Sequence, residues 1–153
     1  MKVSRILQNK GNEYYGIAPD QPLTDAVRLM MDYRIGSLVV MENGVLISII
    51  TERDIMGAVD KYQAELSGIS VREMMAPKLV TCSSDDSIDH AMDLMTNNLT
   101  KRRVRHLPIV DDGKLVGVIS IGDIVYALLT ETKFENQLLK NYIKNWPEES
   151  AVE

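Results

Sequence analysis

Two stretches of the chain repeat each other with a constant shift of 69 residues. Residues 40–56 read VMENGVLISIITERDIM, and residues 109–125 read IVDDGKLVGVISIGDIV. Five aligned positions are identical without a gap: Gly44 and Gly113, Leu46 and Leu115, Ile50 and Ile119, Asp54 and Asp123, and Ile55 and Ile124. Such self-similarity indicates one supersecondary unit used twice. Because a unit of about 60 residues buries little surface alone, we expect the two copies to pack on each other.

Each copy predicts the same order of elements, namely strand, helix, strand, strand, helix. In the first copy we expect these elements at residues 15–18, 23–36, 37–41, 45–50 and 51–66. In the second copy we expect them at residues 79–82, 88–95, 107–110, 115–119 and from Ser120 onward. The Asn43-Gly44 pair between two apolar runs is typical of a tight hairpin. A short amphipathic segment precedes each copy, at residues 3–7 and 71–75.

These boundaries divide the chain into three parts. Residues 1–68 form the first repeat, residues 69–129 the second, and residues 130–153 a helical extension with an acidic tail. When Ala26 is aligned with Ala91, the second repeat has four extra residues, which fall within residues 96–103. We expect the last helix to continue through Tyr142 and to end at Trp146-Pro147.

Composition narrows the class of protein. A net charge of −5 argues against nucleic acid or an anionic membrane as the main partner, because both require a positive surface. The single Cys82 excludes an internal disulfide and a cysteine-based metal site, which fits a reducing compartment. The sequence shows neither an apolar leader nor an apolar run of membrane length. We therefore expect a cytosolic protein with an aliphatic core and no metal site.

The order of elements, present twice with the motifs ITERD and ISIGD, resembles the cystathionine β-synthase (CBS) domain pair, or Bateman module. The resemblance covers roughly residues 1–129. It implies an α/β (α+β) fold of two pseudo-symmetric repeats packed sheet to sheet. It also implies that the domain pair is not itself an enzyme. It further implies an adenosyl ligand in the clefts between the repeats and regulation of a partner protein. AMP, ADP and ATP are the leading ligands, followed by NAD(H) and S-adenosylmethionine.

The motif that carries most of this inference pairs a hydroxyl with a carboxylate, as Thr51 with Asp54 and as Ser120 with Asp123. One interpretation is helix capping, because Ser or Thr followed three residues later by an acidic residue closes the first turn. The other is ligand binding. Free N–H groups and the hydroxyl at a helix start hold a phosphate, and the carboxylate accepts hydrogen bonds from two ribose hydroxyls. In the family that the chain resembles, the Asp grips the ribose. Gly117 stands three residues before Ser120, as is common in that family, whereas the first repeat has Ser48 at this position.

The resemblance also assigns the remaining contacts. Residues before the second strand of each repeat would line an adenine slot: Ile35, Gly36 and Val104. Backbone groups of the first strand would read the adenine edge, near Ile17, Ala18, Thr81 and Cys82. Without the resemblance, such apolar residues at strand starts are ordinary core positions.

A basic cluster at residues 101–106 is the only dense positive run in the chain. Lys101 and Arg102 are interpreted as a solvated helix end. Arg103, Arg105 and His106 come directly before a core strand and are candidates for binding phosphates, which suit the planar fork of Arg. Arg34 and Arg53 are the corresponding cations in the first repeat.

Two rival functions stay open. The chain lacks the common nucleophile, P-loop and dinucleotide-binding motifs, so an enzyme that uses the Arg and His cluster on a phosphate ester has little support. A structural or interaction module, whose aspartates act only as caps, is the stronger rival. In either case we expect a homodimer, because helices at residues 26–31 and 91–95 carry apolar stripes that are broad for one small core.

Overall fold

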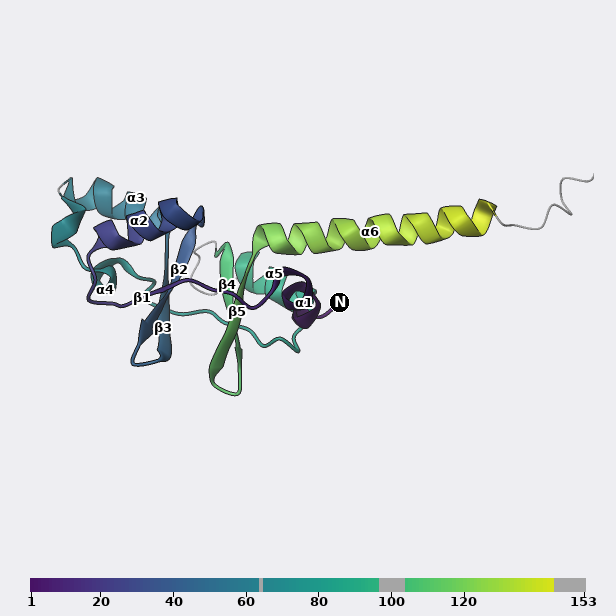
Figure 1. Ribbon diagram of the computed structural model, residues 1–153, viewed down its shortest axis with the longest axis horizontal. Helices are drawn as coiled ribbons and strands as arrows, with labels where there is room; N and C mark the ends of the chain where they lie inside the picture. Colours follow the sequence, from purple (N-terminus) through teal and green to yellow (C-terminus); the bar gives the residue numbers. More distant parts are fainter. Residues whose placement is uncertain (64, 97–103, 145–153) are drawn as a thin grey trace, which may run out of the picture.

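The computed structural model describes residues 1–63, 65–96 and 104–144 and shows two small sheets side by side, each with its own helices (Figure 1). The first part of the chain forms α1 (Val3–Lys10), β1 (Gly16–Ile17), α2 (Leu23–Tyr33), β2 (Ser37–Glu42), β3 (Val45–Thr51), α3 (Glu52–Tyr62) and a short 3-10 turn (Leu66–Gly68). The second part forms α4 (Val71–Met74), α5 (Ile88–Thr96), β4 (His106–Asp111), β5 (Lys114–Ser120) and α6 (Ile121–Lys144).

The two hairpins are close copies of each other. β2 pairs antiparallel with β3, and β4 pairs antiparallel with β5. The ladders shift register at matching positions, between residues 40 and 41 and between residues 109 and 110. Both turns use two residues with positive φ, Asn43-Gly44 and Asp112-Gly113, as the twist of a tight hairpin requires. The predicted mixed fold of two similar repeats is confirmed.

The first strand of the second repeat is much shorter than the sequence predicts. Residues 79–82 do not form a strand; a single parallel bridge joins Cys82 to Ile109. The equivalent ladder in the first repeat has an N–H donor at Val39, which bonds to the carbonyl of Tyr15 at 3.0 Å. Its counterpart in the second repeat is Pro108, which has no N–H to donate. The expected strand at residues 79–82 is therefore wrong because the ladder cannot continue past Cys82.

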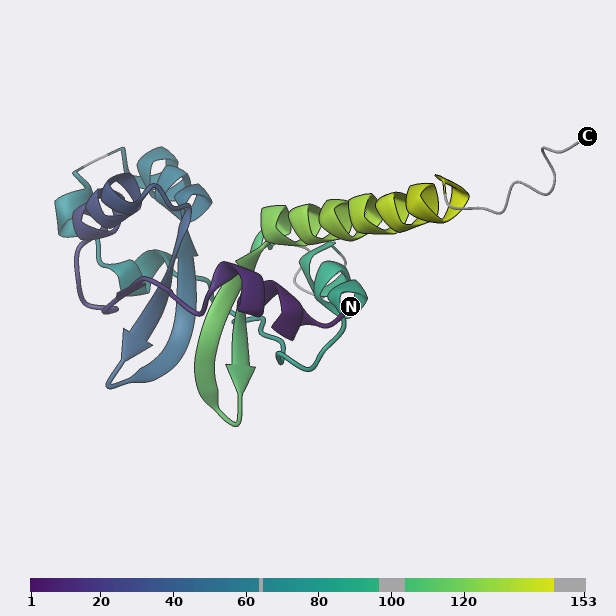
Figure 2. The same cartoon turned by 45° about the vertical axis from the view of Figure 1, so that its right-hand side comes forward.

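Helix bounds differ from expectation in smaller ways. α1 runs on to Lys10 rather than ending at residue 7, and α3 ends at Tyr62 rather than near residue 66. A left-handed Gln63 terminates α3. α6 projects from the body as a single long helix (Figures 1 and 2). The expected end of this helix at Trp146-Pro147 lies outside the described residues.

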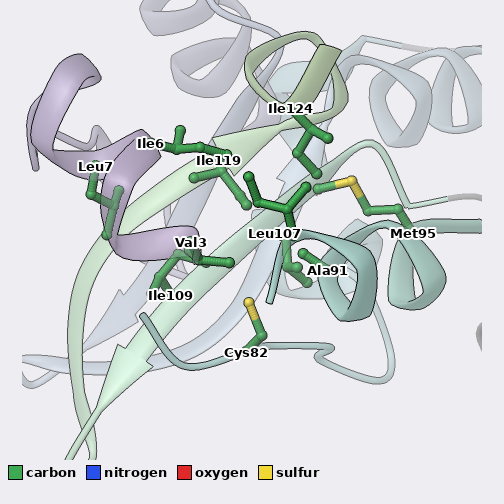
Figure 3. Close-up of a cluster of buried hydrophobic side chains, with 11 residues drawn as sticks. Val3, Ile6, Leu7, Cys82, Ala91, Met95, Leu107, Ile109, Ile119 and Ile124 are labelled. Atoms are coloured by element: carbon green, nitrogen blue, oxygen red, sulfur yellow. The ribbon is translucent and has the colours of Figure 1, made fainter. Parts of the chain in front are cut away.

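Each repeat receives its leading helix from the other part of the chain. Figure 3 shows Val3, Ile6 and Leu7 of α1 pointing into the core of the second sheet, where they meet Leu107 and Ile119. In return, Ile69 and Val71, just before and at the start of α4, pack into the core beneath the first sheet with Leu38, Val40 and Ile50. Backbone hydrogen bonds support both exchanges, from Val3 to Asp86 at 2.9 Å and from Val71 to Gln21 at 2.9 Å. The two repeats are therefore interlocked rather than merely adjacent.

The sheets also meet face to face. Leu38, Val40 and Ile50 point into the first core, so by strand alternation Val39 and Ile49 face the opposite way. Val39 and Ile49 are nevertheless buried, and β3 contacts β5 of the other repeat. The predicted sheet-to-sheet arrangement is confirmed.

Close approach of α1 to β5 depends on Gly117. A Cβ added at Gly117 would lie 2.8 Å from Cδ2 of Leu7, so only glycine allows this contact without movement. In the first repeat, Ser48 takes the place of Gly117, and its hydroxyl donates to the carbonyl of Ala76 at 2.6 Å. The same position thus anchors the leading segment in both repeats, once by packing and once by a hydrogen bond.

Truncation of Leu7 tests the packing of α1 against β5. We expect Leu7→Ala to lower the free energy of unfolding by about 2 to 5 kcal/mol, because it opens a cavity in the second core. Gly117→Ala alone should also destabilise, whereas in the double variant the added methyl enters the space that Leu7 leaves. Urea unfolding of the four proteins should show a double loss smaller than the sum of the single losses. Losses that add within about 0.5 kcal/mol would contradict the contact.

Candidate functional site

The first hydroxyl–carboxylate pair forms a capping box at the start of α3. The backbone N–H of Thr51 donates to Oδ2 of Asp54 at 2.9 Å, and the hydroxyl of Thr51 donates to the same oxygen at 3.1 Å. The backbone N–H of Asp54 in turn donates to that hydroxyl at 3.4 Å. Asp54 is 7% exposed. The capping interpretation is therefore confirmed for this pair, whether or not it also binds a ligand.

The second pair has the same geometry at the start of α6 and gains a cation. The backbone N–H of Ser120 donates to Oδ2 of Asp123 at 2.8 Å, and the N–H of Asp123 donates to the hydroxyl of Ser120 at 3.1 Å. Nζ of Lys10, at the end of α1, lies 2.6 Å from the same carboxylate oxygen. Burial tends to raise the pKa of Asp123, but the hydrogen bonds from Lys10 and Ser120 outweigh it and hold that pKa below its ordinary value.

The first amides of both helices are satisfied within the protein. The N–H of Glu52 donates to the carbonyl of Gly36 at 3.0 Å, and the N–H of Ile121 donates to the carbonyl of Arg105 at 2.9 Å. The third amide of each helix bonds to the capping hydroxyl. Of the first three N–H groups at each helix start, the second is therefore the one left for a phosphate. A bound phosphate would therefore depend mainly on cationic side chains.

Charged groups from both repeats gather around His106. Burial lowers the pKa of His106, the charges of Lys10 and Arg105 lower it further, and the carboxylates of Glu52 and Asp123 oppose them, with the pKa ending below its ordinary 6.5. Glu52 begins the helix of the first repeat, so this cluster spans the junction of the two halves. The buried Nδ1 of His106 has no hydrogen-bond partner among the described residues. A buried polar atom in this state needs a partner that the described residues do not supply.

The predicted adenine-slot residues lie close to this junction. Gly36 is in contact range of Glu52, since a Cβ on Gly36 would meet Oε1 of Glu52 at 2.7 Å. Ile35 and Val104 are half-buried directly before β2 and β4. Their role as walls of an adenine slot stays a prediction.

Three of the four backbone positions predicted to read the adenine edge already have partners in this structure. The N–H of Ala18 donates to the side-chain oxygen of Gln21 at 2.9 Å. Cys82 donates to Pro108 at 3.2 Å and accepts from Val110 at 2.8 Å. Ile17 is paired within the sheet, opposite Val40, while Thr81 is half-buried beside Cys82. A ligand at these positions would have to exchange one of these bonds.

Cys82 itself is a core residue rather than a reactive one. Burial raises the pKa of its thiol to about 12, and the nearby carboxylates Asp86 and Asp111 act in the same direction. The thiol is therefore protonated at neutral pH and a poor nucleophile.

Some of the predicted phosphate-binding cations lie in the described part of the chain. Arg105 is exposed beside His106, and Arg53 is exposed on the first turn of α3. Lys101, Arg102 and Arg103 lie outside the described residues.

Sequence reasoning missed Lys10 and Glu52. A signal for Lys10 existed, because aligning Val3 with Val71 places Lys10 opposite Lys78 in the repeated leading segment. No pattern in the sequence shows that α1 crosses to the second repeat, and this crossing is what brings Lys10 to Asp123.

A family model for the CBS domain matches residues 12–61 and 71–130. The chain belongs to the CBS domain family. It is 33% identical over 151 residues to the mitochondrial CBS domain-containing protein CBSX3 of Arabidopsis thaliana, covering 93% of this chain and 71% of that protein. The crystal structure of the CBS-domain-containing protein ATU1752 from Agrobacterium tumefaciens superposes with a TM-score of 0.77 at 34% identity, covering 83% of this chain and 98% of that one. These matches confirm the resemblance seen in the sequence.

A more distant solved CBS structure shares the fold at lower identity. CBSX2 in complex with AMP superposes with a TM-score of 0.66 at 24% identity, covering 86% of this chain and 98% of that one. Among enzymes, the inosine-5'-monophosphate dehydrogenase of Methanocaldococcus jannaschii is 34% identical over 111 residues, but the match covers only 20% of its length. The CBS pair is a regulatory unit in this family, and the partial match carries no enzymatic activity over to this chain.

Neither a metal-binding cluster nor a membrane-spanning helix is found in the described part of the chain. Residues 1–63, 65–96 and 104–144 contain no group of three His, Cys, Asp or Glu side chains placed to hold a metal ion. Within the same ranges, no helix combines the length and apolar character needed to cross a membrane.

The depressed pKa of His106 predicts a pH dependence of stability. Well above pH 6.5 the imidazole is neutral in the folded and unfolded states alike, so it does not affect stability. As the pH falls below 6.5, the unfolded chain takes up a proton that the folded protein resists, so folding loses stability until the pH passes the lower folded pKa. Denaturant titrations of wild type and His106→Gln between about pH 8 and pH 5 should diverge over this window.

The matched control is His90→Gln, since His90 is exposed on α5. This variant should follow the wild-type pH profile. A His106→Gln protein whose stability changes in parallel with wild type through the whole range would show that His106 is not held in its neutral form.

Proposed function

We propose that this CBS pair senses adenine nucleotides at the starts of α3 and α6 and transmits occupancy to a partner protein. The observation that supports this most strongly is the unpartnered Nδ1 of His106, which lies among charged groups of both repeats. The acid and hydroxyl pairs at the two helix starts, Thr51 with Asp54 and Ser120 with Asp123, supply a fixed carboxylate in each repeat. A carboxylate fixed in this way is well placed to accept two hydrogen bonds from a ribose diol. Lys10, which is paired with Asp123, and Arg105, which lies near His106, suit the phosphate of the same ligand.

Ligands of related structures support the adenosyl class. The CBSX2 structure contains AMP, and the CBS pair of protein MJ0100 was solved with 5'-methylthioadenosine and S-adenosyl-L-methionine. Both share the fold at less than 25% identity, so they identify a class of ligand rather than a particular one. We place AMP, ADP and ATP first, and NAD(H) and S-adenosylmethionine second. The single buried Cys82 is compatible with the cytosol as the proposed location.

The rival function is an interaction module in which the aspartates serve only as helix caps. The observed capping boxes satisfy that role completely. What favours a ligand is the unpartnered Nδ1 of His106 among four charged groups, which capping alone does not require.

Asn substitution separates the two functions, because the side-chain oxygen of Asn can still accept from the N-cap N–H as Asp does at this position, but Asn lacks the charge. We expect Asp54→Asn and Asp123→Asn each to weaken AMP binding at its own site by roughly tenfold to a hundredfold, through loss of the charged contact to the ribose. The free energy of unfolding should fall by at most about 1 kcal/mol. Titration calorimetry with AMP measures the affinities, with GMP as the control ligand.

The loss should be clearer for Asp123→Asn, whose site has the additional cations. Unchanged AMP affinity in both variants would return the aspartates to the capping role. The sensing function would be wrong altogether if the wild type bound none of the proposed ligands, namely AMP, ADP, ATP, NAD(H) and S-adenosylmethionine.

We also propose that the protein forms a homodimer. The helix faces predicted for this contact at residues 26–31 and 91–95 are mostly used within the monomer, since Ala26, Met30, Ala91 and Met95 are buried. Met31 of the first face is exposed, at 73%. Further exposed apolar residues lie on α3 and α6, where Met56 and Val59 are the repeat counterparts of Val125 and Leu128. Their exposed fractions are 71%, 51%, 46% and 39% respectively.

A second copy fits this surface because the exposed residues are duplicated by the internal symmetry. A two-fold axis can therefore place like against like, which is the usual arrangement of a homodimer.

Charge placed on this surface should break the dimer. We expect Val59→Glu to run as a monomer by light scattering at tens of micromolar, because it would bury an unpaired carboxylate. Val45→Glu is the matched control, since Val45 is 60% exposed at the tip of the first hairpin, away from α3 and α6 (Figure 1). A monomeric wild type, or equal masses for the two variants, would contradict the dimer.

A further inference from the structure

The two candidate sites differ in one respect that the internal repeat does not predict. At the start of α6, Lys10 reaches Asp123 from α1, with its Nζ 2.6 Å from Oδ2 and 2.8 Å from the carbonyl oxygen of Val118. Lys78 is the counterpart of Lys10 in the leading segment of the second repeat, and it is exposed, with no ion pair to any described residue. Lys10 is therefore fixed at a carboxylate, whereas its counterpart Lys78 is not fixed at any carboxylate of the described residues.

The difference has a local cause in the two leading helices. α1 has eight residues and carries Lys10 on its last turn. α4 has four residues and ends at Met74, and Pro77 directly before Lys78 cannot extend a helix. Lys78 is thus not held by a helix in the way that places Lys10 against β5 and α6.

We infer that Lys10 is a specificity-determining residue of the Asp123 site and selects adenosine compounds that carry a phosphate. The inference rests on the proposed function, since it assumes that Asp123 binds a ribose. In the structure as it stands, Lys10 is paired with Asp123. A nucleoside without a phosphate has to share this carboxylate with Lys10. A nucleotide offers the lysine a second anion, so that the ammonium group gains a partner when the ribose binds.

Two features of the site make the lysine, rather than the helix start, responsible for the phosphate. The amides of Ile121 and Asp123 are already bonded to the carbonyl of Arg105 and the hydroxyl of Ser120. The lysine side chain is 38% exposed, and its flexible stem allows Nζ to turn from the carboxylate toward a neighbouring anion. A cationic sulfonium such as that of S-adenosylmethionine would meet repulsion at the same place, so the lysine also disfavours that ligand.

The test compares the affinities of AMP and adenosine for Lys10→Met, which keeps the unbranched apolar stem of the side chain and removes its ammonium group. Titrations in the Asp54→Asn background report the Asp123 site alone. We expect Lys10→Met to weaken AMP by roughly tenfold or more. Adenosine should be unchanged or bind more tightly, because its competitor for Asp123 is gone. Lys10→Arg should keep the preference for AMP, and Lys78→Met, in the same background, should leave both affinities unchanged.

The possible outcomes distinguish a failure of the inference about Lys10 from a failure of the proposed nucleotide binding. If Lys10→Met weakens AMP and adenosine by the same factor, or weakens neither, Lys10 has no role in selecting phosphate and the inference is wrong. If the wild type binds neither compound, the proposed function itself fails. A drop in the ratio of AMP to adenosine affinity that Lys10→Arg restores would support the inference, since a purely structural role of Lys10 would not change that ratio.

Discussion

The packing of α1 against the second sheet is the contact on which the candidate site depends. Val3, Ile6 and Leu7 are each no more than 5% exposed in a core that otherwise belongs to the second repeat. This docking carries the end of α1 across the junction, so that Lys10 meets Asp123 although 113 residues separate them in the sequence. If α1 packed less firmly on the second sheet, Asp123 would lose Lys10 and act only in its capping box. Stability and ligand selection are therefore linked through the same short helix.

Pseudo-symmetry explains what the two sites share, and single substitutions explain how they differ. Both helix starts have a capping box and a first amide bonded to the residue just before the first strand of the hairpin, Gly36 before β2 and Arg105 before β4. The differences arise at Pro108, which shortens a ladder, and at Pro77, which precedes the counterpart of Lys10. Small changes of backbone chemistry are thus enough to give two copies of one unit separate properties.

The repeat, the hairpins and the acid and hydroxyl pairs could be predicted from the sequence, because each depends on residues close together along the chain. The hairpin turns follow from Asn43-Gly44 and Asp112-Gly113, which adopt positive φ as expected. The exchange of α1 and α4 could not be predicted, since either amphipathic segment fits either core by its own pattern. The Lys10–Asp123 pair and the charged groups around His106 follow from that exchange and were missed for the same reason.

The most direct test of the central claim, that Asp123 and Lys10 form one nucleotide site, is a crystal structure of the protein grown with AMP. We predict that the ribose hydroxyls lie within hydrogen-bond distance of the Asp123 carboxylate and that Nζ of Lys10 contacts the phosphate. AMP bound away from the start of α6, with Lys10 still paired to Asp123 alone, would contradict the account.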